Sequence, residues 1–438
     1  MTPTFKDLVT VGPHPFQLSG AKFAWLHHYC IIADDMGLGK TLQALMVALA
    51  SGHKTLVVCP AFLRLNWYFE IEKFTRMFYD VCLIEKKVEF EEWRANRDIA
   101  IISYSMVPEA GELFEWAECI IADEAHYLKN LEATRTQLFH KHVYENYPKR
   151  LMLLTGTPLP NNLSEMYSPL RLMGYGMKRT NGKSIFADYP TPEFFCRDFC
   201  IETEVRVGRR TYSKFDGHKN LKLLQEYLVG KYIRREAHEV LDLPPLFHKE
   251  VVVAYENNVD LMKEYEAFNE DDNYSAPAKA KSALIKTPFT IDYAQNLLDQ
   301  EEGPLIIYTD HVDSCLALAE KLDMPHIKGG VPLRKRDRHQ KDFSAGRVKG
   351  LVITLGAGAE GLNLVEGNHL IFNDENWCPA VNDQATKRFH RIGQEKRCTA
   401  HHILGSVQDR RIHGNLKKKR KNIKEVYNVF REATKHTY

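Results

Sequence analysis

The 438-residue sequence lacks the features that define several classes of protein. Its apolar runs fall short of the roughly 18 residues that a membrane span needs, and we expect neither a membrane segment nor a signal peptide. Its nine cysteines are odd in number and follow no disulfide framework, which indicates a reduced intracellular protein. Only Cys196 and Cys200 lie close together, and without a second pair we expect no zinc site there. We expect a cytoplasmic protein of a bacterial or phage-infected cell, or a nuclear one if the source is eukaryotic.

The sequence also has almost no net charge. Its 59 Lys and Arg against 57 Asp and Glu leave +2, which excludes a uniformly basic surface. The balance is uneven, because residues 401–438 hold ten basic and three acidic side chains while the rest of the chain is net negative. Any contact with nucleic acid is therefore expected to be local. A content of 44% hydrophobic residues excludes a disordered or fibrous protein, and the length predicts about two or three domains.

Short β-branched runs, each followed by turn residues and a helical pattern, occur in two groups. The runs cover residues 55–60, 99–104, 119–125 and 150–158 in the first group, and 304–310, 350–358, 369–374 and 400–405 in the second. Continuous apolar strands that alternate with helices predict parallel sheets covered on both faces. The sequence therefore predicts an α/β fold with two units.

Three segments interrupt or follow these groups. Residues 160–243 are rich in aromatic and charged residues and predict a mainly helical insertion, in which residues 205–215 alternate around Gly208 and form either a hairpin or a core-packing segment. Residues 256–282 are polar and acidic, as a connection is. After Gly405, one helical stripe is apolar; it comprises Ile412, Leu416, Ile423, Val426 and Phe430. The basic run Lys417–Lys421 on the other faces is either solvated or contacts phosphates.

A glycine-bearing loop predicts a nucleotide site. The sequence DDMGLGKT at 34–41 follows the apolar run 30–33 and precedes a helical pattern, an arrangement that points backbone N–H groups at phosphates. In this interpretation Lys40 reaches the β- and γ-phosphates and Thr41 binds Mg²⁺. Gly37 and Gly39 keep the tight turn, although Asp34 stands where the strict motif has glycine.

A second motif supplies the carboxylates that hydrolysis of a nucleoside triphosphate needs. The apolar run 119–122 leads into DEAH at 123–126. This places Asp123 at the end of a strand, where it can hold Mg²⁺ through water, and lets Glu124 orient the attacking water. The two motifs lie in the order and setting of an NTPase.

Together with these, LTGTP (154–158), GLNL (361–364) and QATKRFHRIGQ (384–394) resemble the helicase-related Swi/Snf ATPases of superfamily 2, with HRIGQ the most specific part. The resemblance implies two RecA-like lobes, ATP and Mg²⁺ as cofactors, and duplex, forked or four-way DNA as the partner of a monomer. It implies a first lobe at 1–245, a linker at 246–290, a second lobe at 291–406 and a basic C-terminal helix at 407–438.

The resemblance also assigns roles to individual residues. It makes Arg388 and Arg391 arginine fingers that stabilise charge on the γ-phosphate, and it gives Gln17 adenine recognition. The residues expected to bind the nucleotide are Gln17, Met36, Gly37, Leu38, Gly39, Lys40, Thr41, Gly361 and Asn363. Those expected to couple nucleotide state to DNA are His126, Thr155, Thr157 and Gln384. The candidate DNA contacts are Pro60, Ser103, Tyr104, Lys129 and Trp377, together with Arg334 and Arg336 from a local basic cluster.

Trp377 lies in NWCP (376–379), where Cys378 replaces the usual Asn of the family, and its side chain either contacts DNA or fills the core. Lys387 stands where the family usually has Gly. The short chain is similar to small phage-encoded branch-migration helicases and annealing-type relatives.

The leading hypothesis is an ATP-dependent DNA translocase or helicase that remodels forks or Holliday junctions in replication, recombination or repair. One alternative is ATP-driven displacement of DNA-bound proteins. Another is an ATP-switched DNA-binding module with little turnover, against which the intact Lys40, Glu124, Arg388 and Arg391 argue.

Overall fold

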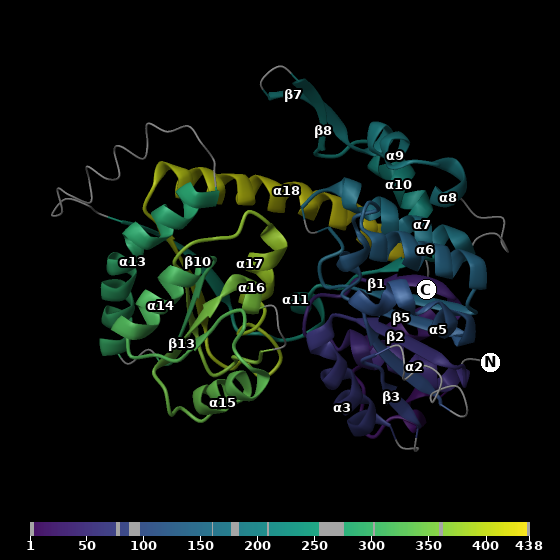
Figure 1. The fold of residues 1–438 in the computed structure, drawn as a ribbon, viewed down its shortest axis with the longest axis horizontal. Helices are drawn as coiled ribbons and strands as arrows, with labels where there is room; N and C mark the ends of the chain where they lie inside the picture. Colours follow the sequence, from purple (N-terminus) through teal and green to yellow (C-terminus); the bar gives the residue numbers. More distant parts are fainter. Residues whose placement is uncertain are drawn as a thin grey trace. The chain divides into compact units, whose positions relative to one another are not determined.

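The structure is a computed structural model that describes residues 4–75, 79–86, 97–159, 161–176, 184–207, 210–253, 276–300, 303–358 and 362–435. The chain divides into two compact units (Figure 1). Unit 1 comprises residues 1–240 and 421–438, and unit 2 comprises residues 241–420. The division between the units falls a few residues before Pro245, where the sequence places the end of the first lobe.

Unit 1 is built on a parallel sheet with the strand order β3-β4-β2-β5-β6-β1-β9. The strands are β1 (Tyr29–Ile32), β2 (Thr55–Cys59), β3 (Val81–Leu83), β4 (Ile99–Ser103), β5 (Cys119–Asp123), β6 (Arg150–Leu154) and β9 (Tyr232–Ile233). Alternate side chains of one strand enter different apolar clusters: Leu56 and Val58 pack in one, and Val57 in the other. Because both faces are covered, the strands are continuous apolar runs, as the sequence predicts.

Helices cover each face of this sheet (Figure 1). Side chains of α1 (Pro15–Leu26), α2 (Lys40–Ser51) and α3 (Arg64–Phe74) enter one apolar cluster, and those of α5 (Gly111–Trp116), α6 (Thr134–Asn146) and α7 (Tyr167–Gly176) enter the other. Short 3-10 helices lie at η1 (Phe5–Leu8), η2 (Ala61–Leu63), η3 (Tyr104–Glu109), η4 (Ala125–Leu128) and η5 (Leu163–Met166).

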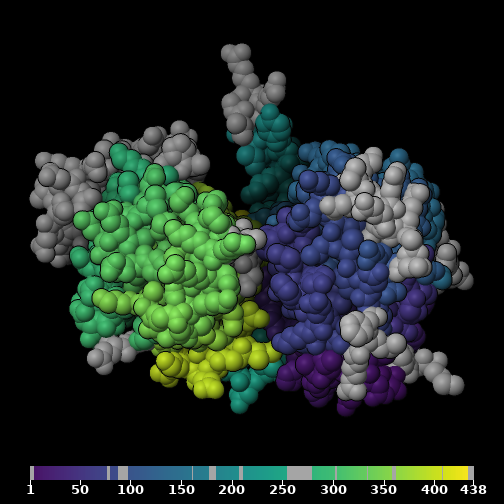
Figure 2. All heavy atoms as spheres, turned by 60° about the horizontal axis from the view of Figure 1, so that its bottom comes forward, coloured from purple at the N-terminus to yellow at the C-terminus, as the bar shows by residue number. Residues whose placement is uncertain are grey.

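The predicted insertion at 160–243 is helical in part. Its remaining helices are α8 (Ile185–Asp188), α9 (Pro192–Phe199), α10 (Leu221–Leu228) and α11 (Ala237–Val240). Between α9 and α10, β7 (Ile201–Val207) and β8 (Arg210–Asp216) pair antiparallel, so residues 205–215 belong to a hairpin rather than to a core-packing segment. This hairpin stands out from the surface of unit 1 (Figure 2). Strand β9 returns to the main sheet beside β1, which the sequence does not reveal because two residues carry no periodicity.

Unit 2 contains a second parallel sheet, with the order β10-β15-β14-β11-β13-β12. Its strands are β10 (Leu246–Val252), β11 (Leu305–Thr309), β12 (His326–Ile327), β13 (Gly350–Thr354), β14 (His369–Phe372) and β15 (Cys398–Leu404). Its helices are α13 (Ala276–Asp299), α14 (Val312–Lys321), α15 (Leu333–Ser344), α16 (Leu355–Gly358) and α17 (Pro379–Thr386). The two parallel sheets confirm the predicted α/β fold class.

The structure corrects the prediction of a linker at residues 246–290, because both ends of this range form regular secondary structure. Its first residues form β10, an edge strand that pairs with β15 along its whole length, and residues from Ala276 onward form α13. Five of the seven residues of β10 are His, Lys, Glu or exposed apolar residues. Its sequence therefore lacks the apolar run by which the central strands were recognised.

The last helix, α18 (Val407–Lys435), confirms the predicted apolar stripe. Ile412 and Leu416 are buried in its unit 2 part, and Val426 and Phe430 join the core of unit 1. Of the basic run, Arg420 pairs with Asp383, Lys417 pairs with Glu250, and Lys419 donates to the carbonyl oxygen of Trp377. The helix therefore packs through its stripe and anchors part of its basic run to unit 2.

None of the nine cysteines, all of which lie among the described residues, forms a disulfide, and Cys196 and Cys200 are both buried. Among the described residues, no helix is both long enough and apolar enough to span a bilayer.

Candidate active site

The strand order of unit 1 brings three sequence motifs to one edge of the sheet. Strands β5, β6 and β1 are neighbours, with Asp123 opposite Leu154 and Leu154 opposite Ile32. Because the strands are parallel, the loops that follow them leave from the same carboxyl edge, which is where open α/β sheets bind ligands. The DDMGLGKT loop, the DEAH segment and the TGTP segment therefore lie side by side.

The DDMGLGKT loop has the backbone shape of a phosphate-binding loop. Gly37 and Gly39 have φ angles of 81° and 68°, a region that favours glycine. A Cβ on Gly39 would lie only 2.3 Å from Nε2 of Gln17. Helix α2 begins at Lys40, with Thr41 in its first turn. The turn thus directs the amino end of a twelve-residue helix at the loop, as anion binding requires.

Lys40 lies within this loop and is surrounded by carboxylates. Its Nζ donates to the carbonyl oxygens of Asp34 and Asp35 at 2.8 and 3.1 Å. Burial lowers the pKa of Lys40, while the charges of Glu124, Asp34 and Asp123 act in the opposite direction. The ammonium group is therefore placed between the phosphate loop and the DEAH carboxylates.

Asp34, the departure from the strict motif, has a structural role. Its carboxylate is fully buried and accepts hydrogen bonds from the backbone N–H and Nε of Arg235, both at 3.0 Å, and from Nε2 of Gln43 at 2.9 Å. Next to it, Asp35 pairs with Arg234 at 3.0 Å. Two adjacent carboxylates thus tie the phosphate loop to an arginine pair about 200 residues later in the chain.

Replacing Asp34 with Asn should therefore destabilise unit 1 by about 3 to 5 kcal/mol, because the half-buried guanidinium group of Arg235 would lose its fully buried, charged partner. The matched control is Asp80→Asn, which breaks the exposed pair of Asp80 with Arg97 and should cost at most about 1 kcal/mol. Urea unfolding of both variants measures the difference. Equal losses in the two variants would show that Asp34 does not anchor the loop.

The DEAH segment places Asp123 and Glu124 at the end of β5. The side chain of Asp123 accepts hydrogen bonds from Nε1 of Trp67 at 2.8 Å and from the backbone N–H of Glu124 at 2.9 Å. Burial, together with the neighbouring charge of Glu124, raises the pKa of Asp123 to about 7. A buried carboxylate of this kind is stabilised by a cation, which suits the predicted Mg²⁺ role.

Glu124 adopts a strained backbone conformation. Its φ angle of 50° lies in the left-handed region, which residues other than glycine rarely adopt and which is often found at functional sites. Its Oε2 atom lies 3.1 Å from Nδ1 of His126. The strained residue thus stands directly after β5, at the position that the sequence assigns to the residue orienting the attacking water.

The TGTP segment is fixed to its neighbours by backbone contacts. The N–H of Thr155 donates to the carbonyl oxygen of Ile32 at 3.1 Å, and Oγ1 of Thr155 accepts from the N–H of Thr157. A Cβ on Gly156 would lie 2.5 Å from Met36 and 3.4 Å from Nζ of Lys40. Thr155 and Thr157 thus lie next to the phosphate loop, as the coupling role predicted for them requires.

Gln17 and its neighbours lie beneath the loop. The Oε1 atom of Gln17 accepts from the N–H of His14 at 2.9 Å, and its Nε2 lies 3.3 Å from the carbonyl oxygen of Leu38. The rings of His14 and Phe16 are stacked. Gln17 is 94% buried, so its contacts support the loop from which an adenine base would be recognised.

The last two motifs are held together within unit 2. Nε2 of Gln394 donates to the carbonyl oxygens of Val365 and Gly367, each at 2.9 Å, and its Oε1 accepts from Lys396. The N–H of Leu364 donates to the carbonyl oxygen of Arg388 at 3.0 Å. The glutamine of HRIGQ thus fixes the arginine-bearing segment against GLNL.

The other predicted residues of these motifs are placed as follows. Arg388 and Arg391 are both half-buried, and Gln384 is buried in α17. Oδ1 of Asn363 is buried without a hydrogen bond, whereas Gly361 lies outside the described residues.

The candidate DNA contacts of unit 1 fall into different environments. Tyr104 is 98% buried, and its hydroxyl donates to the carbonyl oxygen of Asp123 at 2.8 Å. Ser103 and Pro60 are buried at the ends of β4 and β2. Lys129 is paired with Glu165 at 2.7 Å. Tyr104 is therefore buried beside Asp123 and donates a hydrogen bond to its backbone. The sequence does not show this burial.

Trp377 is 36% exposed, and Nζ of Lys279 lies 5.9 Å from its ring centroid. Lys279 also pairs with Asp310 at 2.6 Å. The ring of Trp377 is therefore only partly buried. Its exposure does not decide between the two predicted roles, which were contact with DNA and packing in the core.

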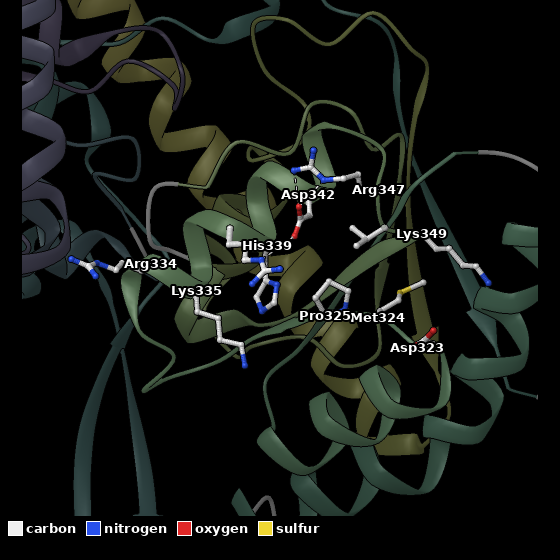
Figure 3. Close-up of a pocket in the computed structure, with 11 residues that line it drawn as sticks. Asp323, Met324, Pro325, Arg334, Lys335, His339, Asp342, Arg347 and Lys349 are labelled. Atoms are coloured by element: carbon white, nitrogen blue, oxygen red, sulfur yellow. Dashed lines mark hydrogen bonds and ion pairs between the residues drawn. The ribbon is translucent and has the colours of Figure 1, made fainter.

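The basic cluster of α15 borders a surface cavity of about 880 Å³ in unit 2 (Figure 3). Arg334 and Lys335 are exposed at its rim, whereas Nε of Arg336 donates to the carbonyl oxygen of Val331 at 2.8 Å. Arg347 pairs with Asp342, as the dashed line in Figure 3 shows. Arg334, Lys335 and Arg338 are thus the exposed basic residues of this cluster, and of these Arg338 also lies 3.8 Å from Asp342.

Two protein families match this chain. The SNF2-related domain matches residues 17–272, and the helicase conserved C-terminal domain matches residues 290–393. The chain belongs to the SNF2-related family. It is therefore an ATPase of the SNF2 type within superfamily 2, and its two α/β units correspond to two RecA-like lobes.

Several characterised proteins are similar to this SNF2-type chain. DNA annealing helicase and endonuclease ZRANB3 of Bos taurus is 26% identical over 435 residues, which cover 90% of this chain and 38% of that protein. DNA repair and recombination protein RAD54-like of Gallus gallus is 26% identical over 481 residues, covering 90% of this chain and 65% of that protein. The chain thus spans well under half the length of ZRANB3.

Among solved structures, the Sulfolobus solfataricus SWI2/SNF2 ATPase core in complex with dsDNA is 22% identical with a TM-score of 0.46, and the match covers 95% of this chain and 93% of that chain.

Proposed function

We propose that this SNF2-type ATPase couples ATP hydrolysis to movement on duplex or branched DNA and that it remodels forks or four-way junctions by branch migration. The observation that carries the proposal is the common sheet edge at which Lys40, Asp123 and Glu124 meet in unit 1. The names of two relatives, an annealing helicase and a repair and recombination protein, favour junction remodelling.

The residues of unit 1 fit ATP and Mg²⁺. The two glycines give the turn its left-handed backbone and lead into the start of α2, and the raised pKa of Asp123 suits a divalent cation. In the proposed mechanism Lys40 binds the β- and γ-phosphates, Thr41 and Asp123 hold the metal, and Glu124 orients the attacking water and accepts its proton. Mg²⁺ when bound neutralises the charge that develops on the phosphates.

Unit 2 contributes the arginines in this proposal. Arg388 and Arg391 stabilise charge on the γ-phosphate, and Gln394 positions both through the loop that it fixes. Hydrolysis then depends on residues of both lobes, so that each turnover is linked to a relative movement of the two lobes and of the DNA-contacting residues that each lobe carries. This link is what converts an ATPase into a translocase.

The branch-migration activity is tested directly with a labelled four-way junction. The protein with ATP should convert the junction to two duplexes, and a non-hydrolysable ATP analogue should not support the reaction. A flush duplex of the same sequence should stay intact. Unchanged junctions alongside robust DNA-stimulated ATP hydrolysis would contradict junction remodelling and favour displacement of DNA-bound proteins.

The basic rim of the unit 2 cavity provides a further prediction. Replacing Arg334 and Lys335 with Glu should weaken DNA binding uniformly across sequences and reduce the slope of log K against log salt by about two, because two phosphate contacts are lost. Fluorescence anisotropy over a salt series measures both effects. The control replaces Lys22 and Lys141, two exposed lysines of unit 1, with Glu. If the plots of log K against log salt had the same slope for the two double variants, this cavity would not contact DNA.

A further inference from the structure

Unit 2 contains a buried cluster of one carboxylate and two imidazoles that the proposed ATPase cycle does not use. Glu375 follows β14, His402 lies in β15, and His413 lies in the unit 2 part of α18. Their exposed fractions are 7%, 2% and 5%. Three polar side chains from three separate segments are therefore held together away from water, which is costly unless each finds a partner.

The contacts within the cluster leave atoms without hydrogen bonds. Nδ1 of His413 donates to Oε2 of Glu375 at 2.5 Å. Nδ1 of His402 lies 3.1 Å from Oε1 of Glu375, but the pair lacks hydrogen-bond alignment, so both atoms are buried without a hydrogen bond. Nε2 of His413 is also buried without a hydrogen bond, and it lies 3.3 Å from Oε1 of Glu250.

The neighbour of His402 explains how its Nδ1 is oriented. Nε2 of His402 lies 3.0 Å from Nδ1 of His248 on β10. When His402 donates from Nε2 to His248, its Nδ1 presents a lone pair towards Glu375. In the other tautomer, the Nδ1 proton is buried without an aligned acceptor.

Glu375 brings a carboxylate to the centre of the cluster. Its Oε2 lies 2.5 Å from Nδ1 of His413, and its Oε1 lies 3.1 Å from Nδ1 of His402. A carboxylate oxygen and an imidazole nitrogen thus face each other at 3.1 Å without a proton aligned between them. This arrangement is typical of two ligands of one metal ion.

We propose that Glu375, His402 and His413 bind a transition-metal ion of the Zn²⁺ class. One ligand atom from each residue lies within 4.8 Å of the others. In tetrahedral sites with metal–ligand distances of about 2.0–2.1 Å, neighbouring ligand atoms lie about 3.3 Å apart, close to the separation of Oε1 and Nδ1. Two imidazoles with one carboxylate suit zinc, whereas Mg²⁺ and Ca²⁺ take oxygen ligands.

The hydrogen bond from His402 to His248 is the outer contact that orients a metal-bound imidazole. The ion joins the segment after β14, strand β15 and the first turns of α18. It therefore fixes the start of the basic helix to the sheet of unit 2, close in sequence to Trp377, and its role is structural rather than catalytic.

The alternative cluster in unit 2, formed by Asp310, His311 and Asp374, is less suited to a metal. Nζ of Lys279 already supplies a positive charge to Asp310 at 2.6 Å, and Asp374 accepts from Oγ1 of Thr309 and the N–H of Asp310. Its carboxylates are therefore satisfied by the protein.

The test titrates the full chain, freed of metal by a chelator, with Co²⁺ and then displaces Co²⁺ with Zn²⁺. We expect one equivalent of Co²⁺ with the visible absorption of a four-coordinate site of nitrogen and oxygen ligands, its stoichiometric displacement by Zn²⁺, and a higher midpoint of thermal unfolding with metal. Wild-type protein that takes up no metal at micromolar concentrations would overturn the proposal. Sulfur-to-cobalt charge-transfer bands would also overturn it, because they would place the ion at Cys196 and Cys200.

Two variants locate the site. Glu375→Gln and His413→Asn should each weaken Co²⁺ binding at least about 100-fold, whereas His326→Asn, which changes a half-buried histidine of unit 2 outside the cluster, should bind as the wild type does. Circular dichroism of the metal-free proteins checks that each variant is folded. Wild-type binding by both cluster variants would contradict the assignment and leave the cluster a hydrogen-bonded network.

Discussion

Replacing Arg391 with Ala is expected to lower DNA-stimulated ATP hydrolysis by about 10³- to 10⁵-fold, the effect of removing an arginine finger in related phosphoryl-transfer enzymes. The guanidinium group stabilises charge that develops on the γ-phosphate only during the reaction, so its loss raises the barrier without removing the phosphate loop. The measured quantity is kcat for ATP at saturating duplex DNA.

Two further variants show whether the effect is specific. Arg391→Lys keeps the positive charge but not the planar fork of donors, and it should recover only a small part of the rate. Arg397→Ala removes an exposed arginine that stacks on Phe247 in the same unit, and it should turn over at nearly the wild-type rate. A loss of less than tenfold in Arg391→Ala, with an intact fold, would exclude Arg391 from the reaction.

Replacing Glu124 with Gln is expected to lower kcat by about 10²- to 10⁴-fold, since the amide can neither orient the attacking water in the same way nor accept its proton. ATP binding should survive, because Lys40 and the glycine turn are unchanged. Removing the charge of Glu124 also removes one of the causes that raise the pKa of Asp123, so that Asp123 ionises more readily and Mg²⁺ binding is not weakened.

The two effects are separated by measuring the dissociation constant of a fluorescent ATP analogue beside the turnover rate. The control is Glu132→Gln, an exposed carboxylate in the segment that follows η4. Glu132→Gln should match the wild type in both measurements. If Glu124→Gln lost nucleotide binding in proportion to turnover, Glu124 would be a binding residue and another group would have to be the base.

The central strands and motif loops were predictable because each depends on a few neighbouring residues. Apolar runs such as 119–122 lie in the core with alternate side chains on opposite faces of the sheet. A continuous run of apolar residues predicts this burial without knowledge of any distant contact. The strand order β5-β6-β1, which brings the motifs together, was not predicted, because it pairs strands far apart in the sequence and leaves no local pattern.

What escaped prediction depends on contacts between distant residues. The partner of Asp34 is Arg235, and Trp67, within the pattern of α3, donates to Asp123 across 56 residues. No local signal marks either pair, although two acidic residues beside the glycines could have suggested a basic partner. Tyr104 was expected to contact DNA, yet its position after a buried strand turns its ring into the core. Edge strands β9 and β12 are two residues each, too short for any periodic pattern.

The proposed function requires that DNA stimulates ATP hydrolysis by this chain. The most direct measurement compares the steady-state rate of ATP hydrolysis without DNA and with single-stranded, duplex, forked and four-way DNA at equal nucleotide concentration. The proposed function predicts a many-fold rise with duplex, forked and four-way DNA, which Glu124→Gln removes. Basal hydrolysis that stays the same with every DNA would contradict it.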